Sequence, residues 1–196
     1  VIRNNYNTAY WNTRGGGAFQ NDGIFENCVF AGNKIIGTNG YSVYGGGLYL
    51  RSGTVFNSIF HHNSLEHADD VKHYGTAVFF EVAKFYNNTI TKNEGSYAMY
   101  SGNYFAQFGY SGYLEIYNSI ICDNTVTAGT NEFDFETGSS SIYLTNCLFK
   151  NSTMHKDFTS FPHINNIYHF DDFSGSTLFA DAANDNYIPH STSPAI

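Results

Sequence analysis

Short segments of alternating apolar and polar residues recur along the chain at a nearly constant spacing. An asparagine marks each segment, at Asn27, Asn57, Asn87, Asn118 and Asn146. The third residue after each asparagine is apolar: Phe30, Phe60, Ile90, Ile121 and Phe149. Two positions before each asparagine stands a further apolar residue: Phe25, Val55, Phe85, Ile116 and Leu144. This alternation predicts β-strands, because successive strand residues point to opposite faces of a sheet.

A repeat of about 30 residues indicates a solenoid, since such a short strand buries a core only when neighbouring repeats stack on it. One strand per repeat, stacked about 4.8 Å apart, predicts a right-handed parallel β-helix. We expect an all-β fold of about five coils over residues 1–152. Residues 153–196 are expected to form an irregular C-terminal end segment of the same domain. Val1 and Asn4 are expected to align with Phe30 and Asn33 of the next coil.

The asparagine and glycine positions are predicted to be structural. Asparagine tolerates the left-handed backbone conformation of a tight corner, and its amide can hydrogen-bond to the equivalent amide one coil away. We therefore expect the column that begins at Asn27 to form a ladder along the stack. The glycines at 15–17 and 45–47 suit sharp turns or the close approach of two backbones.

The three cysteines provide a test of this register. Cys28 and Cys147 fall in one column, four coils apart, which corresponds to roughly 19 Å at the spacing of stacked strands. A disulfide requires Cα atoms within about 7 Å of one another. Cys122 stands out of this column. We therefore predict buried, free thiols and no disulfide framework.

Composition narrows the class of partner. Charged residues make up 13% of the chain and aromatic residues 18%, and the net charge is -8 with only 9 lysines and arginines. Such a chain lacks the cationic surface that binds nucleic-acid phosphates, so we expect no nucleic-acid partner. No apolar run approaches the ~18 residues of a membrane-spanning helix, and no transmembrane segment is predicted. The chain starts at Val1 and stops within a repeat-like motif, so we expect it to be a piece of a longer protein.

Two motifs carry a resemblance to known proteins. The stretches Gly16-Gly17-Ala18 and Phe30-Ala31-Gly32-Asn33 resemble the paired GGA and FxxN repeats of polymorphic outer membrane proteins. The C-terminal LFADAANDNYIPHSTSPAI is similar to a segment of choice-of-anchor Q domain proteins, with matches at Asp181, Asn184, Tyr187, Ser193, Pro194, Ala195 and Ile196. The resemblance implies the parallel β-helix of bacterial surface and secreted proteins. It also implies a secreted or cell-surface location, associated with the outer membrane.

The function that this resemblance favours is non-catalytic. We expect a stiff module for adhesion, display, or binding of glycans or another partner. Expected partners are the remainder of a longer chain or another surface protein, glycans, and the machinery of protein export. The alternative is a polysaccharide lyase or glycoside hydrolase that acts on acidic polysaccharide, because β-helices include pectate-lyase-like enzymes. Pectin-hydrolysing relatives carry NTD, DD and GHG motifs; Asp69-Asp70 is a DD pair in the variable loop, but the chain contains no NTD and no GHG.

A catalytic or metal-binding site is expected most readily in the variable loop that follows Asn63. Residues 61–73 contain four histidines, three carboxylates and a lysine. His67, Asp69 and Asp70 are candidate general acid and base groups. Histidine and carboxylate side chains also bind metals, and the candidate ligands are His61, His67, Asp69 and His73. The spacing matches no established ligand pattern, and a solvated connecting loop is the favoured explanation of the composition. No cofactor is predicted, and calcium is the alternative if an ion is bound.

A row of aromatic residues offers a second kind of site. Tyrosines recur in the early coils at Tyr41, Tyr44, Tyr49 and Tyr74. If these rings point outward, they form a surface on which sugar rings can stack. If they pack beneath loops, they belong to the scaffold.

Overall fold

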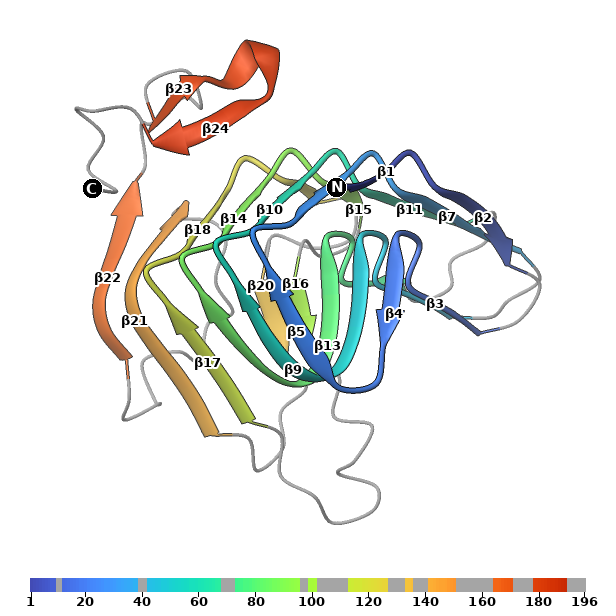
Figure 1. The fold of residues 1–196 in the computed structure, drawn as a ribbon, viewed down its shortest axis with the longest axis horizontal. Coiled ribbons are helices and arrows are strands. Elements are labelled where there is room, and N and C mark those ends of the chain that lie inside the picture. Colours follow the sequence, from blue (N-terminus) through green and yellow to red (C-terminus); the bar gives the residue numbers. More distant parts are fainter. Residues whose placement is uncertain are drawn as a thin grey trace.

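The computed structural model describes residues 1–9, 12–38, 42–67, 73–95, 99–101, 113–126, 133–135, 141–150, 164–170 and 178–189. These residues form parallel strands that stack turn upon turn, so the predicted all-β parallel solenoid is confirmed (Figure 1). Each turn lies against the next through in-register strand pairs.

The largest sheet has fourteen strands, arranged in two columns. One column contains β1 (Ile2–Arg3), β6 (Val29–Ala31), β10 (Ile59–His61), β14 (Thr89–Thr91) and β18 (Ile120–Cys122). The other contains β4 (Ala18–Gln20), β5 (Gly23–Glu26), β9 (Leu48–Phe56), β13 (Val78–Tyr86), β16 (Met99–Ser101), β17 (Tyr113–Tyr117) and β20 (Phe133–Phe135). The two columns are joined by β21 (Ser141–Lys150), which also pairs with β22 (Ile164–Phe170).

Three smaller sheets complete the described fold. The second sheet contains β2 (Tyr6–Ala9), β7 (Lys34–Gly37), β11 (Ser64–His67), β15 (Glu94–Gly95) and β19 (Thr125–Val126). The third contains β3 (Thr13–Arg14), β8 (Val43–Tyr44) and β12 (His73–Tyr74). The fourth is an antiparallel hairpin of β23 (Phe179–Asp181) and β24 (Asn186–Pro189), joined through the 3-10 helix η3 (Ala182–Asn184).

The predicted number of coils is corrected to about three complete turns. Among the described residues, only the first three turns carry a strand in every one of the first three sheets, because the third sheet stops at β12. The spacing of the strands accounts for this. Ten residues, including β12, lie between β11 and β13, whereas only three lie between β15 and β16 in the following turn. Parallel pairing in the largest sheet nevertheless continues beyond residue 152, as far as β22.

Each complete turn bends at three corners where the backbone is left-handed. The first corner uses Gly15, Gly45 and Gly75, with φ between 67° and 71°. The second uses Asn27, Asn57, Asn87, Asn118 and Asn146, with φ between 50° and 55°. The third uses Asn4, Gly32, His62, Lys92 and Asp123. Glycine and asparagine dominate these columns because their side chains tolerate positive φ.

The two asparagine columns differ in environment. In the column that begins at Asn27, Asn57 and Asn87 are exposed. Asn87 Nδ2 donates a hydrogen bond to Asn57 Oδ1 at 3.1 Å. The column of Asn33, Asn63 and Asn93 points inward, and each of these residues is at most 1% exposed. Side-chain amides link Asn5, Asn33, Asn63, Asn93 and Asn124 at 2.9 Å per step. The continuous ladder is therefore the inward one.

The first turn is shifted by one residue from the predicted alignment. Ile2, not Val1, pairs with Phe30, and Asn5, not Asn4, hydrogen-bonds to Asn33. Asn4 takes the corner position that Gly32 holds one turn later. The first turn is thus two residues shorter than the second, and a difference of this size falls within the variation of the other spacings.

Stacked apolar side chains fill the solenoid. Phe30 and Phe60 are fully buried, and their rings stack at 4.5 Å and 2°. Val55, Phe85, Ile116 and Leu144 form a second buried column, one residue in each successive turn. Cys147 is also fully buried, whereas Cys28 is half-buried because it lies in the first turn of its column. None of the three cysteines forms a disulfide.

The glycine triplets let successive turns approach closely at the first corner. A Cβ atom on Gly46 would lie 2.4 Å from the carbonyl oxygen of Thr76, and one on Gly47 would lie 2.6 Å from that of Ala77. Only glycine fits at such positions.

The C-terminal hairpin packs against the outside of the solenoid. Leu178, Phe179 and Tyr187 form a buried cluster with outward-facing residues of the largest sheet: Ile120, Cys122 and Leu148. Although β10 is far away in sequence, this contact places Asp185 on its outer side, next to His61.

Candidate functional site

Five aromatic rings gather around the glycine corner of the first three turns. We name Phe19, Tyr44, Tyr49, Tyr74 and Phe79 the aromatic surface. Two stacks compose it. Phe19 stacks on Tyr49 at 5.2 Å, and Tyr49 stacks on Phe79 at 5.0 Å. Tyr44 stacks on Tyr74 at 5.5 Å, and its ring meets Phe79 edge-on at 4.9 Å. The in-register strands place these rings one turn apart, as the repeat requires.

Exposure separates the members of the aromatic surface. Phe19 is 45% exposed, and Tyr44 and Tyr74 are half-buried. Tyr49 is only 2% exposed, so its ring supports its neighbours and does not present a face to solvent. Tyr49 thus stacks within the predicted row, between Phe19 and Phe79, but is covered by its neighbours. Tyr41, the remaining predicted ring, lies outside the described residues.

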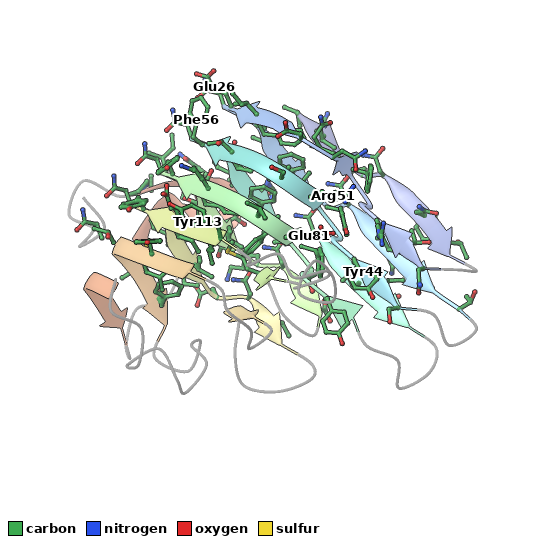
Figure 2. The ribbon with its side chains drawn as sticks, turned by 90° about the horizontal axis from the view of Figure 1, so that it is seen from below. Glu26, Tyr44, Arg51, Phe56, Glu81 and Tyr113 are labelled. Carbon is green, nitrogen blue, oxygen red and sulfur yellow. The ribbon has the colours of Figure 1, made fainter. Side chains whose placement is uncertain are left out.

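Charged groups adjoin the aromatic surface, and Figure 2 labels two of them, Arg51 and Glu81, together with Tyr44. The Arg14 guanidinium lies 5.1 Å from the centre of the Tyr49 ring, a cation–π arrangement. The Tyr49 hydroxyl donates to the carboxylate of Glu81, and Arg51 Nε lies 3.6 Å from the other oxygen of that carboxylate. Burial and the adjacent Glu81 raise the pKa of Tyr49, so its hydroxyl stays protonated and acts as a donor. The surface thus combines apolar rings with fixed polar groups.

The histidine-rich loop is distributed over three sheets. His61 ends β10 in the largest sheet, His67 ends β11 in the second, and His73 begins β12 in the third. Asp69 and Asp70 lie outside the described residues, so the predicted catalytic set and the predicted metal set remain predictions. The same holds for the hydrolase or lyase alternative, which rests on these residues.

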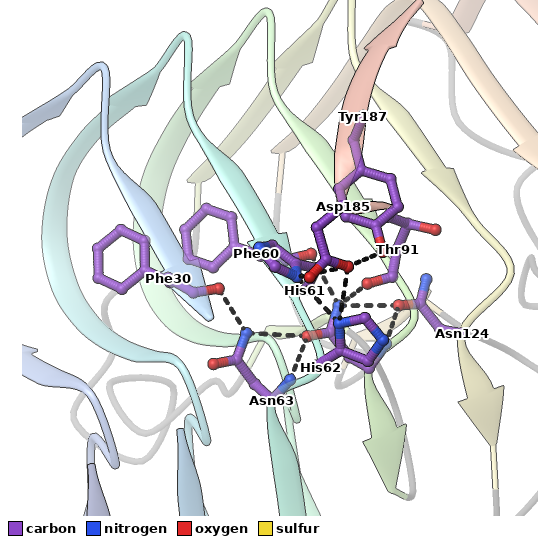
Figure 3. A network of polar contacts seen from close by, with 10 residues as sticks. Phe30, Phe60, His61, His62, Asn63, Thr91, Asn124, Asp185 and Tyr187 are labelled. Carbon is purple, nitrogen blue, oxygen red and sulfur yellow. Dashed lines mark hydrogen bonds and ion pairs between the residues drawn. The ribbon is translucent and has the colours of Figure 1, made fainter. Parts of the chain in front are cut away.

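His61 has described partners that the sequence did not indicate (Figure 3). Its Nδ1 lies 3.0 Å from Nδ1 of His62 and 3.8 Å from Oδ1 of Asp185. His62 Nδ1 lies 3.6 Å from the same carboxylate oxygen. His62 occupies a left-handed corner, and Asp185 follows η3 with φ of 58°. We name these three residues the His–His–Asp cluster.

The His–His–Asp cluster is half shielded from water. His61 is 8% exposed, whereas His62 and Asp185 are exposed. Burial lowers the pKa of His61, the Asp185 carboxylate opposes this shift, and His62 adds to it. His61 is therefore neutral near pH 7. Its ring lies 5.0 Å from that of Tyr187, whose hydroxyl donates to Asp185 Oδ1 at 3.0 Å.

Asp185 was missed because no local pattern marks it. It lies in the C-terminal segment, and only the docking of the hairpin brings it to the strand end that carries His61 and His62. The adjacent pair His61-His62 is visible in the sequence, but no motif or repeat spacing links it to a carboxylate as distant along the chain as Asp185.

Among the described residues, no helix has the length and apolar character needed to cross a membrane. Comparisons of the chain with protein-family models, with curated protein sequences and with solved structures found no match.

Proposed function

We propose that this protein is a non-catalytic β-solenoid module that binds glycans through the aromatic surface. The carrying observation is the convergence of Phe19, Tyr44 and Tyr74, all partly exposed, on one corner of three successive turns. Strand register fixes their spacing, so the surface is rigid before any ligand arrives.

Aromatic rings and charged groups together suit a carbohydrate. The apolar faces of sugar rings pack on aromatic faces, while hydroxyl groups need hydrogen-bond partners. Arg14 and Arg51 are exposed beside the rings and supply donors. The buried Glu81 anchors Arg51 and the Tyr49 hydroxyl, which limits their movement. Preorganised polar groups of this kind favour orientation-specific binding.

The proposal extends to location and to the role of the scaffold. The GGA and FxxN motifs support an exported, cell-surface module of the polymorphic outer membrane protein type, in which the solenoid displays the aromatic surface away from the membrane. Protease treatment of intact native cells tests this: the protein is degraded if it is displayed, and is protected if it is not.

Glycan binding is tested on a glycan array and by titration calorimetry with the ligands that the array finds. Replacing Tyr44 by alanine is expected to weaken binding about 5- to 150-fold, because ring contacts of this kind contribute about 1–3 kcal/mol. Tyr117→Ala is the matched control, since Tyr117 is also half-buried and stacks on Tyr86 at 5.5 Å, but lies outside the aromatic surface. No binding on the array, or equal losses for the two variants, would refute the proposal.

A further inference from the structure

Three ligand-type atoms of the His–His–Asp cluster converge on a single point. The two histidine Nδ1 atoms and Asp185 Oδ1 form a triangle with sides of 3.0, 3.6 and 3.8 Å. The point equidistant from the three atoms lies about 2.0 Å from each, which is the distance at which zinc binds histidine nitrogen and carboxylate oxygen. The residues come from two segments that meet only through docking of the C-terminal hairpin.

Hydrogen bonding accounts for only one side of this triangle, the 3.0 Å contact between the two Nδ1 atoms. The distances of 3.6 and 3.8 Å from Asp185 Oδ1 to the two Nδ1 atoms exceed those of hydrogen bonds. The two Nδ1 atoms share at most one proton between them. A divalent cation would satisfy all three lone pairs at once.

We propose that His61, His62 and Asp185 bind one zinc ion and thereby fasten the C-terminal hairpin to the solenoid. Two imidazoles and one carboxylate form a donor set of the kind that zinc prefers. Calcium takes six to eight oxygen ligands and does not suit this set. With three protein ligands, the ion retains at least one position for water.

The surroundings of the cluster fit a metal centre. Tyr187 is 1% exposed and donates its hydroxyl to the ligating oxygen of Asp185, an outer contact that orients carboxylate ligands in metal sites. Thr91, on the neighbouring strand β14, lies opposite His61 of β10 and is fully buried. Its Oγ1 has no hydrogen-bond partner among the described residues, and a metal-bound water would supply one.

Backbone geometry gives a matched pair of variants. His62 and Lys92 occupy the same left-handed corner in successive turns, with φ of 53° and 55°, and both are exposed. Asparagine tolerates this conformation. His62→Asn therefore removes a ligand while retaining the corner. Lys92→Asn makes the same replacement one turn further on, at a residue that supplies none of the three ligand atoms and whose backbone hydrogen bond to His62 is retained.

The test is calorimetric titration of zinc chloride into the full chain after removal of metal by a chelator. The wild type and Lys92→Asn are expected to bind one zinc ion per chain. His62→Asn and Asp185→Asn are expected to bind it about 100-fold more weakly or not at all. Absence of one-to-one binding in the wild type, or equal affinity in all four proteins, overturns the proposal. Tighter binding of calcium than of zinc also overturns it, because the nitrogen donors would then be uninvolved.

Hydrogen exchange tests the fastening role separately. Zinc is expected to slow amide exchange in residues 178–189 of the wild type and of Lys92→Asn, and to have no such effect in Asp185→Asn. Zinc binding without slower exchange in this segment would refute the link to the hairpin.

Discussion

Replacement of Asn63 by alanine tests whether the inward amide ladder holds the turns together. Asn63 is fully buried, and its side chain makes four hydrogen bonds. Its Nδ2 donates to Phe30 O and to Asn93 Oδ1, both at 2.9 Å. Its Oδ1 accepts from the backbone N–H and the side-chain amide of Asn33, at 3.1 and 2.9 Å. All the hydrogen-bonding capacity of this amide is therefore used.

The magnitude follows from the groups that Asn63→Ala leaves without partners. Two buried N–H donors of Asn33 lose their acceptor, and each unsatisfied buried donor costs about 1–3 kcal/mol. The lost contacts of Phe30 O and the small void raise the total. We expect a loss of about 4 kcal/mol, a large share of the 5–15 kcal/mol by which domains are stable.

Urea unfolding followed by circular dichroism measures this loss against a control on the same turn. Asn57 is exposed, and it is required mainly for its left-handed backbone, with φ of 51°. Asn57→Ala should cost about 1–2 kcal/mol, and Asn57→Gly almost nothing, because glycine adopts this conformation freely. At Asn63 glycine should bring no rescue. If Asn63→Ala costs no more than Asn57→Ala, the argument for a stabilising inward ladder is wrong.

Two further predictions concern the corner and the core. Gly46→Ala should destabilise the fold by about 3 kcal/mol, because its Cβ would lie 2.4 Å from Thr76 O. In Gly23→Ala the new Cβ meets only the Gln20 side chain, so thermal melting should show a much smaller shift; equal shifts would contradict the close-packed corner. Burial raises the pKa of the Cys147 thiol to about 11. At pH 8 this thiol stays neutral, and a thiol reagent followed by mass spectrometry should modify half-buried Cys28 well before Cys147; the reverse order would show that the interior opens readily.

The solenoid was predictable because its pattern is repeated, whereas the environment of each column was not. A spacing of about 30 residues identifies Phe30 and Asn63 as column members whatever their partners. It does not tell which asparagine column points inward, because both alternate with apolar residues. The exposed column proved to serve the corner, and the inward column carries the continuous ladder. The exposed column has positive backbone φ and the inward column does not, and φ is set by the turn as a whole.

In the candidate sites as well, some contacts follow from the repeat spacing and others do not. Tyr44 and Tyr74 could be paired from their spacing, since strand register carries equivalent residues to neighbouring turns. The burial of Tyr49 depends on how rings from two sheets meet at a corner, which spacing does not encode. Asp185 reaches His61 through a hairpin that lies outside the repeat, so no period could point to it.

The inward ladder also has a direction. In the amide-to-amide bonds each side chain donates to the amide of the next turn, with Asn5 as the first donor and Asn124 as the last acceptor. The second N–H of Asn33, Asn63 and Asn93 donates to a backbone carbonyl of the preceding turn. Backbone partners fix this orientation, because the N–H of Asn33 must meet an oxygen and Phe30 O must meet a nitrogen. The side-chain dipoles therefore align head to tail along the solenoid axis, and each bond polarises the next. The position of a substitution in the ladder therefore decides how many turns it affects. Replacing Asn63 removes amide contacts to the turns on both sides, whereas replacing Asn5 removes only the contact to Asn33.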